Sequence, residues 1–287
     1  MRRRALASLA LLLLAVPAPA APDAAGPAGE MRELFRLSGL ESQLGSLDDL
    51  VAASLTPNLA KVPAAQKDIV RHAALDAFSS PVLQERVYAE LAKVYDPQQA
   101  AAALRWLRSP LGRRITLLEM QTSTAEGMRE LESFALQLKK QMPPNTRIAL
   151  AHELDKAMGA TDFAVELSLA CARASMSAIG AALPAERRLD PDKIESAIES
   201  QRKALHEQLG QVSLVSTLYT YRSLTDTELE TYLMFTRGDA GRWYHGVVEQ
   251  ALLHVLSEQA AQMGRQVALA LRAPAPGTQP SPAQRGD

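Results

Sequence analysis

Histidine and carboxylate side chains are the first candidates for chemistry in this chain, because a suitable spacing would let them bind a metal ion. His245 and His254 lie nine residues apart, which places them on opposite sides of a helix. His152 and His206 are each followed by a glutamate, but neither has the second histidine four residues later that a zinc-protease helix requires. The spacing predicts no metal site, and we interpret these histidines as ordinary surface or core residues.

Nucleophilic and acid–base chemistry also lack a supporting pattern. The chain has no Gly-x-Ser-x-Gly turn and no glycine-rich phosphate loop. Acidic pairs such as Glu130 and Glu132 do not face each other on a helix, so solvated faces are the favoured interpretation. Cys171, the only cysteine, lies in an apolar run and predicts an inert buried thiol; an intermolecular disulfide or a reactive thiol is the alternative. We expect no catalytic residue and no cofactor.

The most distinctive local pattern is the run Ser109-Pro110-Leu111-Gly112-Arg113. It predicts the start of a helix, because Ser109 can cap it, Pro110 suits the first helical position and Gly112 removes a side chain from the first turn. Two interpretations remain open. The structural one is that another helix backbone crosses closely at Gly112. The functional one is an anion site, in which free amides and the positive helix end act together with Arg113.

The same pattern recurs in the second half of the chain, where Gly241 corresponds to Gly112 and Arg242 to Arg113, at an offset of 129. In the helix before each break, Trp106 corresponds to Phe235. This register predicts an internal duplication; the alternative is that two amphipathic helices have become similar by convergence.

Each copy also predicts a capped helix start. Asp96 and Thr225 are expected N-caps, and Gln99 and Glu228 stand three residues later, so both copies have the spacing of a capping box. A long amphipathic helix is expected after each break, over residues 113–141 and 242–271. Upstream, residues 31–55 are expected to mirror residues 160–183.

Trp243 and Tyr244 follow the second break, together with His245, and have no aromatic counterparts in the first copy. We interpret them as a half-buried belt where the second unit meets the first unit or its own tail. The alternative is an exposed aromatic contact surface for a partner or an apolar ligand.

The helix–break–helix pattern resembles a bacterial family of exported helical domains known as domain of unknown function 2059. Its recognisable core is a capped helix with an aromatic-containing stripe, followed by Ser-Pro-Leu-Gly and a basic residue. Residues 96–114 keep this core, whereas the second copy has Gly238-Asp239 in place of Ser-Pro. The resemblance covers only these two short stretches, one in each copy. It implies export and a helical fold, and it supplies no activity.

The elements that position these residues are expected to be helices throughout. Aromatic residues make up only 5% of the chain, β-branched alternation is rare, and Ala, Leu, Glu, Gln and Arg dominate. The breaks predict two homologous multi-helix units, residues 30–143 and 146–272, packed as a pseudo-symmetric pair or a short array.

The amino terminus predicts export. Three arginines precede an apolar run over residues 5–16, and the small residues around Ala20 predict cleavage after it, which leaves a periplasmic or extracellular protein with no transmembrane segment. A flexible leader over residues 21–29 and a disordered tail over residues 273–287 are expected. Without the three arginines, 28 basic residues face 32 acidic ones, which gives no electrostatic basis for binding nucleic acid.

Three function classes follow from the sequence. The favoured one is a non-enzymatic protein-interaction module of the cell envelope, which predicts a filled core and an exposed apolar patch. The second is a binder of an apolar or lipid-like ligand, which predicts a cavity between helices lined by Leu, Val and Met. The third is an enzyme, which would require polar groups that converge in a pocket, and the sequence shows none.

Overall fold

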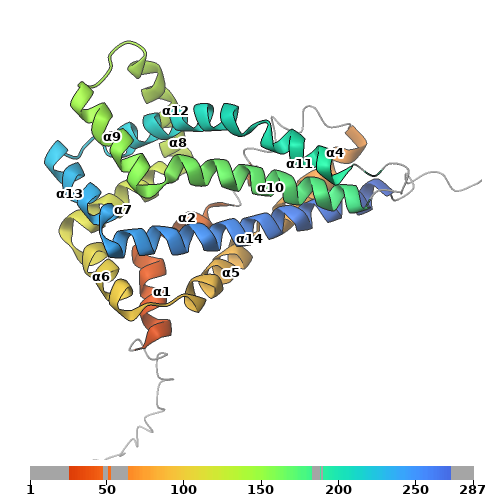
Figure 1. Cartoon of the computed structure of the whole chain (residues 1–287), viewed down its shortest axis with the longest axis horizontal. Helices are drawn as coiled ribbons and strands as arrows, with labels where there is room; N and C mark the ends of the chain where they lie inside the picture. Colours follow the sequence, from red (N-terminus) through yellow and green to blue (C-terminus); the bar gives the residue numbers. More distant parts are fainter. Residues whose placement is uncertain (1–25, 48–50, 53–63, 183–187, 189, 273–287) are drawn as a thin grey trace, which may run out of the picture.

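The computed structural model describes residues 26–47, 51–52, 64–182, 188 and 190–272. Within these ranges the chain is helical and contains no strand, as the sequence predicts. The predicted signal sequence over residues 1–20 and the predicted tail over residues 273–287 lie outside the described residues. The helices are α1 Pro27–Leu37, α2 Leu40–Gly45, α4 Ala64–Ala77, α5 Ser80–Lys93, α6 Pro97–Arg108, α7 Pro110–Thr122, α8 Ala125–Leu138, α9 Asn145–Met158, α10 Ala160–Ala182, α11 Pro191–Glu199, α12 Arg202–Thr220, α13 Asp226–Arg237 and α14 Asp239–Arg272 (Figure 1).

Two long helices, α10 and α14, lie side by side and run in the same direction (Figure 1). The Ser175 hydroxyl donates to the Ala260 carbonyl across the pair at 3.1 Å. A Cβ atom on Gly264 would lie under 3.0 Å from the Ser175 carbonyl oxygen, so the small side chains of this seam set how closely the helices approach. The seam forms the most extensive contact between two helices in the described chain.

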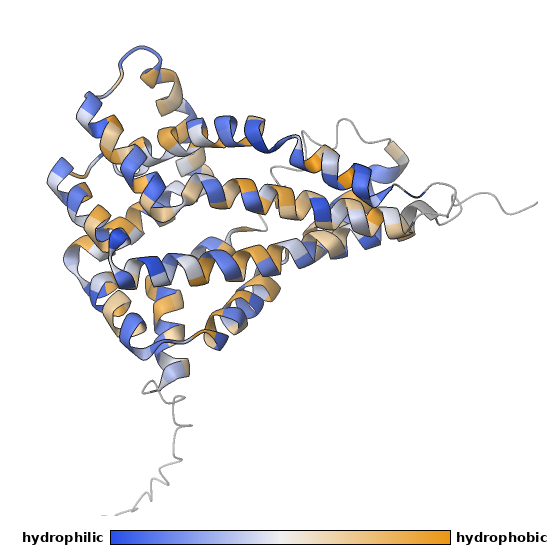
Figure 2. Cartoon of the chain, viewed as in Figure 1, coloured by the Kyte–Doolittle hydropathy of each residue, from blue (hydrophilic) through white to orange (hydrophobic). Residues whose placement is uncertain are grey.

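The hydrophobic cores draw on both predicted units. Met31 and Phe35 of α1 pack with Leu83 of α5 and with Val255 of α14 in one cluster. A second cluster joins Ile115 of α7 to residues of α9 and α13. Figure 2 shows apolar and polar residues alternating along α10 and α14, as expected for helices that bury one face. Residues 30–143 and 146–272 therefore share their cores.

The predicted helix over residues 113–141 is wrong, because the chain breaks between α7 and α8. Thr124 caps α8 by accepting a hydrogen bond from the Gly127 amide at 3.0 Å, and a Cβ atom on Gly127 would lie under 3.0 Å from the Gln121 carbonyl oxygen. The matching prediction for residues 242–271 is confirmed by α14. The chain thus turns after α7, whereas it continues as one long helix in α14.

The predicted leader over residues 21–29 is wrong in its last part. Residues 27–29 form the first turn of α1, where Pro27 suits the first helical position and the Glu30 amide donates to the Gly26 carbonyl at 3.0 Å. Residues 21–25 lie outside the described residues.

One described helix segment, Ala160–Ala181 within α10, is long and apolar enough to cross a membrane by length and composition. Core helices of globular proteins pass the same test. Here the apolar side chains of α10, such as Val165 and Leu169, pack in a cluster with Ile194 and Ile198 of α11.

Candidate functional site

The two helix corners predicted from the sequence have closely similar geometry. Ser109 caps α7 by accepting a hydrogen bond from the Gly112 amide at 3.0 Å. A Cβ atom on Gly112 would lie under 3.0 Å from the Trp106 carbonyl oxygen, and one on Gly241 equally close to the Phe235 carbonyl oxygen. The close neighbour is thus the end of the preceding helix in each copy, which favours the packing interpretation.

The arginines at these corners also bind within the chain. The Arg113 guanidinium donates to the Arg108 carbonyl at 2.7 Å, and Arg242 donates to the Arg237 carbonyl in the same register. Both side chains therefore satisfy carbonyl groups at the end of the preceding helix. This use of the arginines counts against the anion site, because the charge it requires is directed at the protein backbone.

The two predicted caps differ in detail. The Asp96 carboxylate accepts hydrogen bonds from the Gln98 and Gln99 amides at 2.9 and 3.0 Å. Thr225 and Glu228 form a complete capping box, in which each side chain binds the backbone amide of the other residue. Both N-cap predictions are confirmed, whereas the described contacts show the reciprocal bond only at α13.

Trp106 and Phe235, the aromatic residues that the predicted register matches, stack directly on each other. Their ring centroids lie 4.5 Å apart and the ring planes differ by 8°. Trp106 also stacks against Tyr232, at 5.8 Å. Two positions that the sequence register matches, 129 residues apart, are therefore in contact between α6 and α13.

Trp243 and Tyr244 pack inside this junction. Trp243 contacts the cluster that contains Met31 and Phe35, and both side chains contact the cluster that contains Leu34. The structure thus places the aromatic pair between α14 and the helices of the first unit. Each side chain is half-buried.

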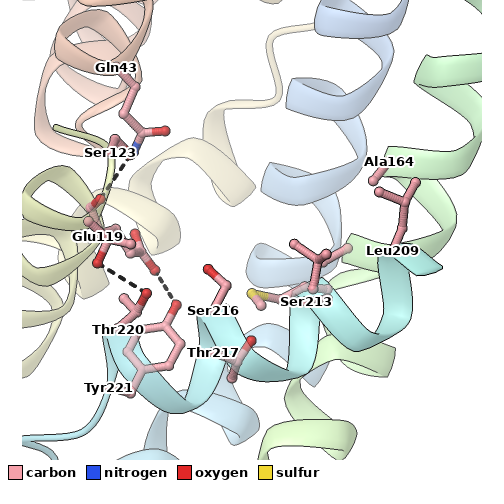
Figure 3. Close-up of a pocket in the computed structure, with 14 residues that line it drawn as sticks. Gln43, Glu119, Ser123, Ala164, Leu209, Ser213, Ser216, Thr217, Thr220 and Tyr221 are labelled. Carbon is pink, nitrogen blue, oxygen red and sulfur yellow. Dashed lines mark hydrogen bonds between the residues drawn. The ribbon is translucent and has the colours of Figure 1, made fainter. Parts of the chain in front are cut away.

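A buried polar cluster that the sequence analysis missed lies next to these aromatics. Glu119 of α7 accepts hydrogen bonds at the same oxygen, Oε1, from the hydroxyl groups of Tyr221 at 2.6 Å and Tyr232 at 3.0 Å. The Tyr232 hydroxyl also lies 3.6 Å from the sulfur of Met158 in α9. Figure 3 shows Glu119 and its hydrogen bond with Tyr221.

Two cavities lie against Glu119. The outer cavity, of about 420 Å³, is shown in Figure 3 and lies among α7, α10 and α12. The inner cavity, of about 190 Å³, lies beside the Trp106–Phe235 stack. Both cavities are lined by Gln43, Glu119 and Met158, so these residues form the wall between them.

Burial shifts the acid–base properties of this region. It raises the pKa of Glu119, although the two tyrosine hydroxyl groups favour the ionised carboxylate. The pKa values of Tyr221 and Tyr232 are raised well above their usual range by burial and by the charge of Glu119. Burial lowers the pKa of His245, which lines the inner cavity, to about 4. Its Nε2 atom is buried and has no hydrogen-bond partner among the described residues.

Groups elsewhere in the described chain offer less chemistry. No set of three or more histidine, cysteine and carboxylate side chains within it could hold a metal ion. Cys171 is half-buried, and burial raises the pKa of its thiol, which disfavours the reactive thiolate.

One sequence signal could have identified Glu119. The buried face of α7 includes Gly112, Ile115 and Thr116, and Glu119 continues that stripe at the next helical turn. An acidic residue in the middle of an apolar stripe is rare unless it is paired. Its tyrosine partners could not be identified from the sequence, since they belong to the second predicted unit.

Comparison with family models, with curated proteins and with solved structures finds no match to this chain. The geometry of the site is therefore the basis for any functional conclusion.

Proposed function

We propose that this chain is an exported, non-enzymatic helical module that binds a small ligand in the two cavities around Glu119. The observation that carries this proposal is the outer cavity of about 420 Å³ with a half-buried carboxylate in its wall. Cavities of about 300–1,000 Å³ with a few converging polar groups are typical of small-molecule sites.

The lining of the outer cavity refines the ligand expected from the sequence. Apolar contacts come from Met158, Leu209 and Val212, but hydroxyl groups form much of the remaining wall. These are the side chains of Thr122, Ser123, Ser213, Ser216, Thr217 and Thr220. Four of these hydroxyl groups, those of Thr122, Ser123, Ser213 and Thr220, already donate hydrogen bonds within the chain. Their oxygens still make this part of the wall polar, so a small ligand with polar and apolar parts fits better than a lipid-like one.

A protein-interaction module, the function favoured by the sequence, is less well supported. It predicts a filled core and one exposed apolar patch. The strongly exposed large apolar side chains are distributed over many helices rather than along one of them. They include Val82 in α5, Leu117 in α7, Leu136 in α8, Val212 in α12, Met234 in α13 and Leu269 in α14.

The tandem duplication is part of the proposal, and helix contacts support it. α1 packs on α6 as α9 packs on α13. Arg108 pairs with Glu33 of α1, and Arg237, its equivalent in the second copy, pairs with Glu153 of α9. α1 and α9 are each followed by a glycine with positive φ, Gly39 at 77° and Gly159 at 67°.

These contacts change one detail of the expected register. They pair α1 with α9, whereas the sequence comparison matched residues 31–55 with residues 160–183. Gly39 and Gly159 are related by an offset of 120, so the offset of 129 applies only to the later helices. A difference in length between the two halves, located before α6, accounts for the change.

Export rests on the amino-terminal sequence, and the resemblance to domain of unknown function 2059 supports it. The duplication gives the proposed site a simple origin. Two copies of one unit meet at the Trp106–Phe235 stack, and Glu119 lies beside that contact, since both Trp106 and Glu119 line the inner cavity.

Native mass spectrometry of the full chain, purified from the exported fraction of its host, tests the proposal. We expect a bound small molecule, and we expect Ser216→Phe, which fills the outer cavity, to remove it. Ser177→Phe, at an exposed position of α10 that lines neither cavity, is the matched control. A chain that carries no ligand, and acquires none from a small-molecule extract of that fraction, would contradict the proposal.

A further inference from the structure

Among the described residues, Glu119 is the only carboxylate that lines either cavity. Neither a lysine nor an arginine contributes to the described walls, and His245 is neutral at neutral pH because its pKa is about 4. None of the ion pairs among the described residues includes Glu119. The arginines of this region are paired elsewhere, for example Arg114 with Glu228 and Arg222 with Glu130.

One oxygen of this carboxylate is left without a donor. Both tyrosine hydroxyl groups bind Oε1, and Oε2 receives no hydrogen bond from the described chain. Glu119 is half-buried and has no counter-charge in the described walls, and partial loss of water favours uptake of a proton or of a cation by its carboxylate. The unused oxygen therefore offers a place for a donor group of a ligand.

The other groups around the cavities suit a cation. Hydroxyl oxygens of Ser216 and Thr220 line the outer cavity and can accept hydrogen bonds from an ammonium group. The rings of Tyr221 and Tyr232 meet edge to face, with centroids 5.7 Å apart, next to the carboxylate. Of these two rings only that of Tyr221 lines the outer cavity, so it is the ring that a cation bound there could contact.

An anionic ligand is disfavoured by the same groups. It would face the negative charge of Glu119 with no arginine or lysine in the described lining to balance it. A neutral ligand would leave the charge of the carboxylate uncompensated. A group with both a positive charge and several hydrogen-bond donors satisfies both the carboxylate and the hydroxyl oxygens.

We infer that the ligand is a small amphipathic primary amine whose ammonium group binds Oε2 of Glu119 and whose apolar part contacts Met158, Leu209 and Val212. This inference rests on the proposed function and adds the chemical class of the ligand. The outer cavity holds roughly a dozen groups of the size of a water molecule, at about 30 Å³ each, which suits an aryl-alkyl amine.

Ammonium binding is linked to the protonation of Glu119. The ammonium group takes the place of the proton on the carboxylate, so the affinity rises with pH until Glu119 is fully ionised. The other titratable groups that face this site are Tyr221 after α12, Tyr232 of α13, and Tyr244 and His245 of α14. The tyrosines stay protonated and His245 stays neutral between pH 5 and 8, since burial raises the pKa of each tyrosine and lowers that of His245 to about 4.

Isothermal titration calorimetry of the dialysed full chain tests this inference with three ligands of one skeleton. The probes are 2-phenylethylamine, 2-phenylethanol and phenylacetate. We expect binding of the amine at least tenfold tighter than that of the alcohol, and no binding of the anion. Glu119→Gln should weaken amine binding at least tenfold and weaken binding of the alcohol much less, because only the amine loses an opposite charge.

Glu130→Gln is the matched control, because Glu130 also accepts a tyrosine hydroxyl, that of Tyr219, but lines neither cavity. Circular dichroism verifies that each variant is folded, and Tyr232→Phe provides a second perturbation of the carboxylate if Glu119→Gln fails to fold. Equal affinity for the alcohol and the amine would overturn the amine inference and leave the proposed function standing. Absence of binding by all three probes would overturn the inference, and the extract experiment described above then decides the proposed function separately.

Discussion

The corners at Ser109–Arg113 and Gly238–Arg242 reach the same geometry with different residues. The first has a serine cap followed by proline, whereas the second has Gly238 followed by Asp239, whose carboxylate pairs with Arg242 at 2.6 Å. The glycine in the first turn and the arginine after it are common to both. Close packing against the preceding carbonyl, rather than a particular capping side chain, therefore defines this corner.

The helices that follow the two corners differ in length, although their first turns are similar. α7 stops at Thr122 because Thr124 and Gly127 build another corner. At the equivalent positions of the second copy the chain has Leu253 and Leu256, so α14 continues without a cap or a glycine. The cap and the glycine therefore account for the difference. With them the chain turns from α7 into α8, and without them it continues as the long helix α14, which packs along α10.

The largest effect is expected from filling the corners. Gly112→Ala and Gly241→Ala should each destabilise the protein by on the order of 3 kcal/mol, because the new Cβ atom meets a backbone carbonyl that cannot move without shifting a helix. Gly246→Ala in α14 is the control, since its Cβ atom meets nothing within 4 Å, and it should gain roughly 0.5–1 kcal/mol. Urea unfolding measures all three. Unequal losses of unfolding free energy at the two positions would show that the two corners are not packed in the same way.

The next effect concerns His245, which occupies the position of Thr116 in the second copy. The pKa of His245 is depressed from 6.5 to about 4 in the folded protein, so its contribution to stability is complete above pH 6.5 and is lost as the pH falls toward 4. The difference in unfolding free energy between wild type and His245→Thr should change by up to about 3 kcal/mol across this range. A difference that does not change with pH would show that the imidazole is not buried in solution.

Glu249, also on α14, should act in the opposite direction. Burial, and then the charge of Asp162, raises its pKa to about 7, so its contribution is present below pH 4.5 and is lost as the pH rises to 7. Glu249→Gln should therefore become progressively more stable than wild type between pH 4.5 and 7. Thermal unfolding at several pH values in this range measures the trend.

A moderate effect is expected from the caps of α6 and α13. Asp96→Ala and Thr225→Ala should each lower the free energy of unfolding by about 1 kcal/mol. Asp96 accepts hydrogen bonds from two backbone amides and Thr225 from one, and these amides would lose their side-chain acceptor. Thr225→Ser is the control, since it keeps the acceptor. Hydrogen exchange of the first-turn amides reports the loss locally, and unchanged protection would contradict the capping role.

The smallest effect is expected at the corner arginines. Arg113→Ala and Arg242→Ala should each cost less than about 1 kcal/mol, because both side chains are exposed and bind carbonyl groups that water can also reach. The loss at Arg242 should be the larger one and should shrink in high salt, since Arg242 also pairs with Asp239. Equal losses that do not depend on salt would remove this distinction between the two corners.

The helical class, the N-caps at Asp96 and Thr225, and both corners can be predicted from local sequence patterns alone. These features depend on neighbours within a few residues, so their signals lie next to each other in the sequence. The second break, at Thr124–Gly127, had the same kind of local signal, a capping residue with a glycine three positions later. It was missed because the apolar periodicity continues through it.

The residues that form the site, in contrast, are brought together by helix packing. Glu119 needs the hydroxyl groups of Tyr221 and Tyr232, which come from residues 102 and 113 positions later. The two cavities exist because α7, α10, α12 and α14 leave space between them, and that space depends on how entire helices pack. No local pattern encodes such packing, because each apolar stripe fixes which face of its helix is buried but not which helix will cover that face.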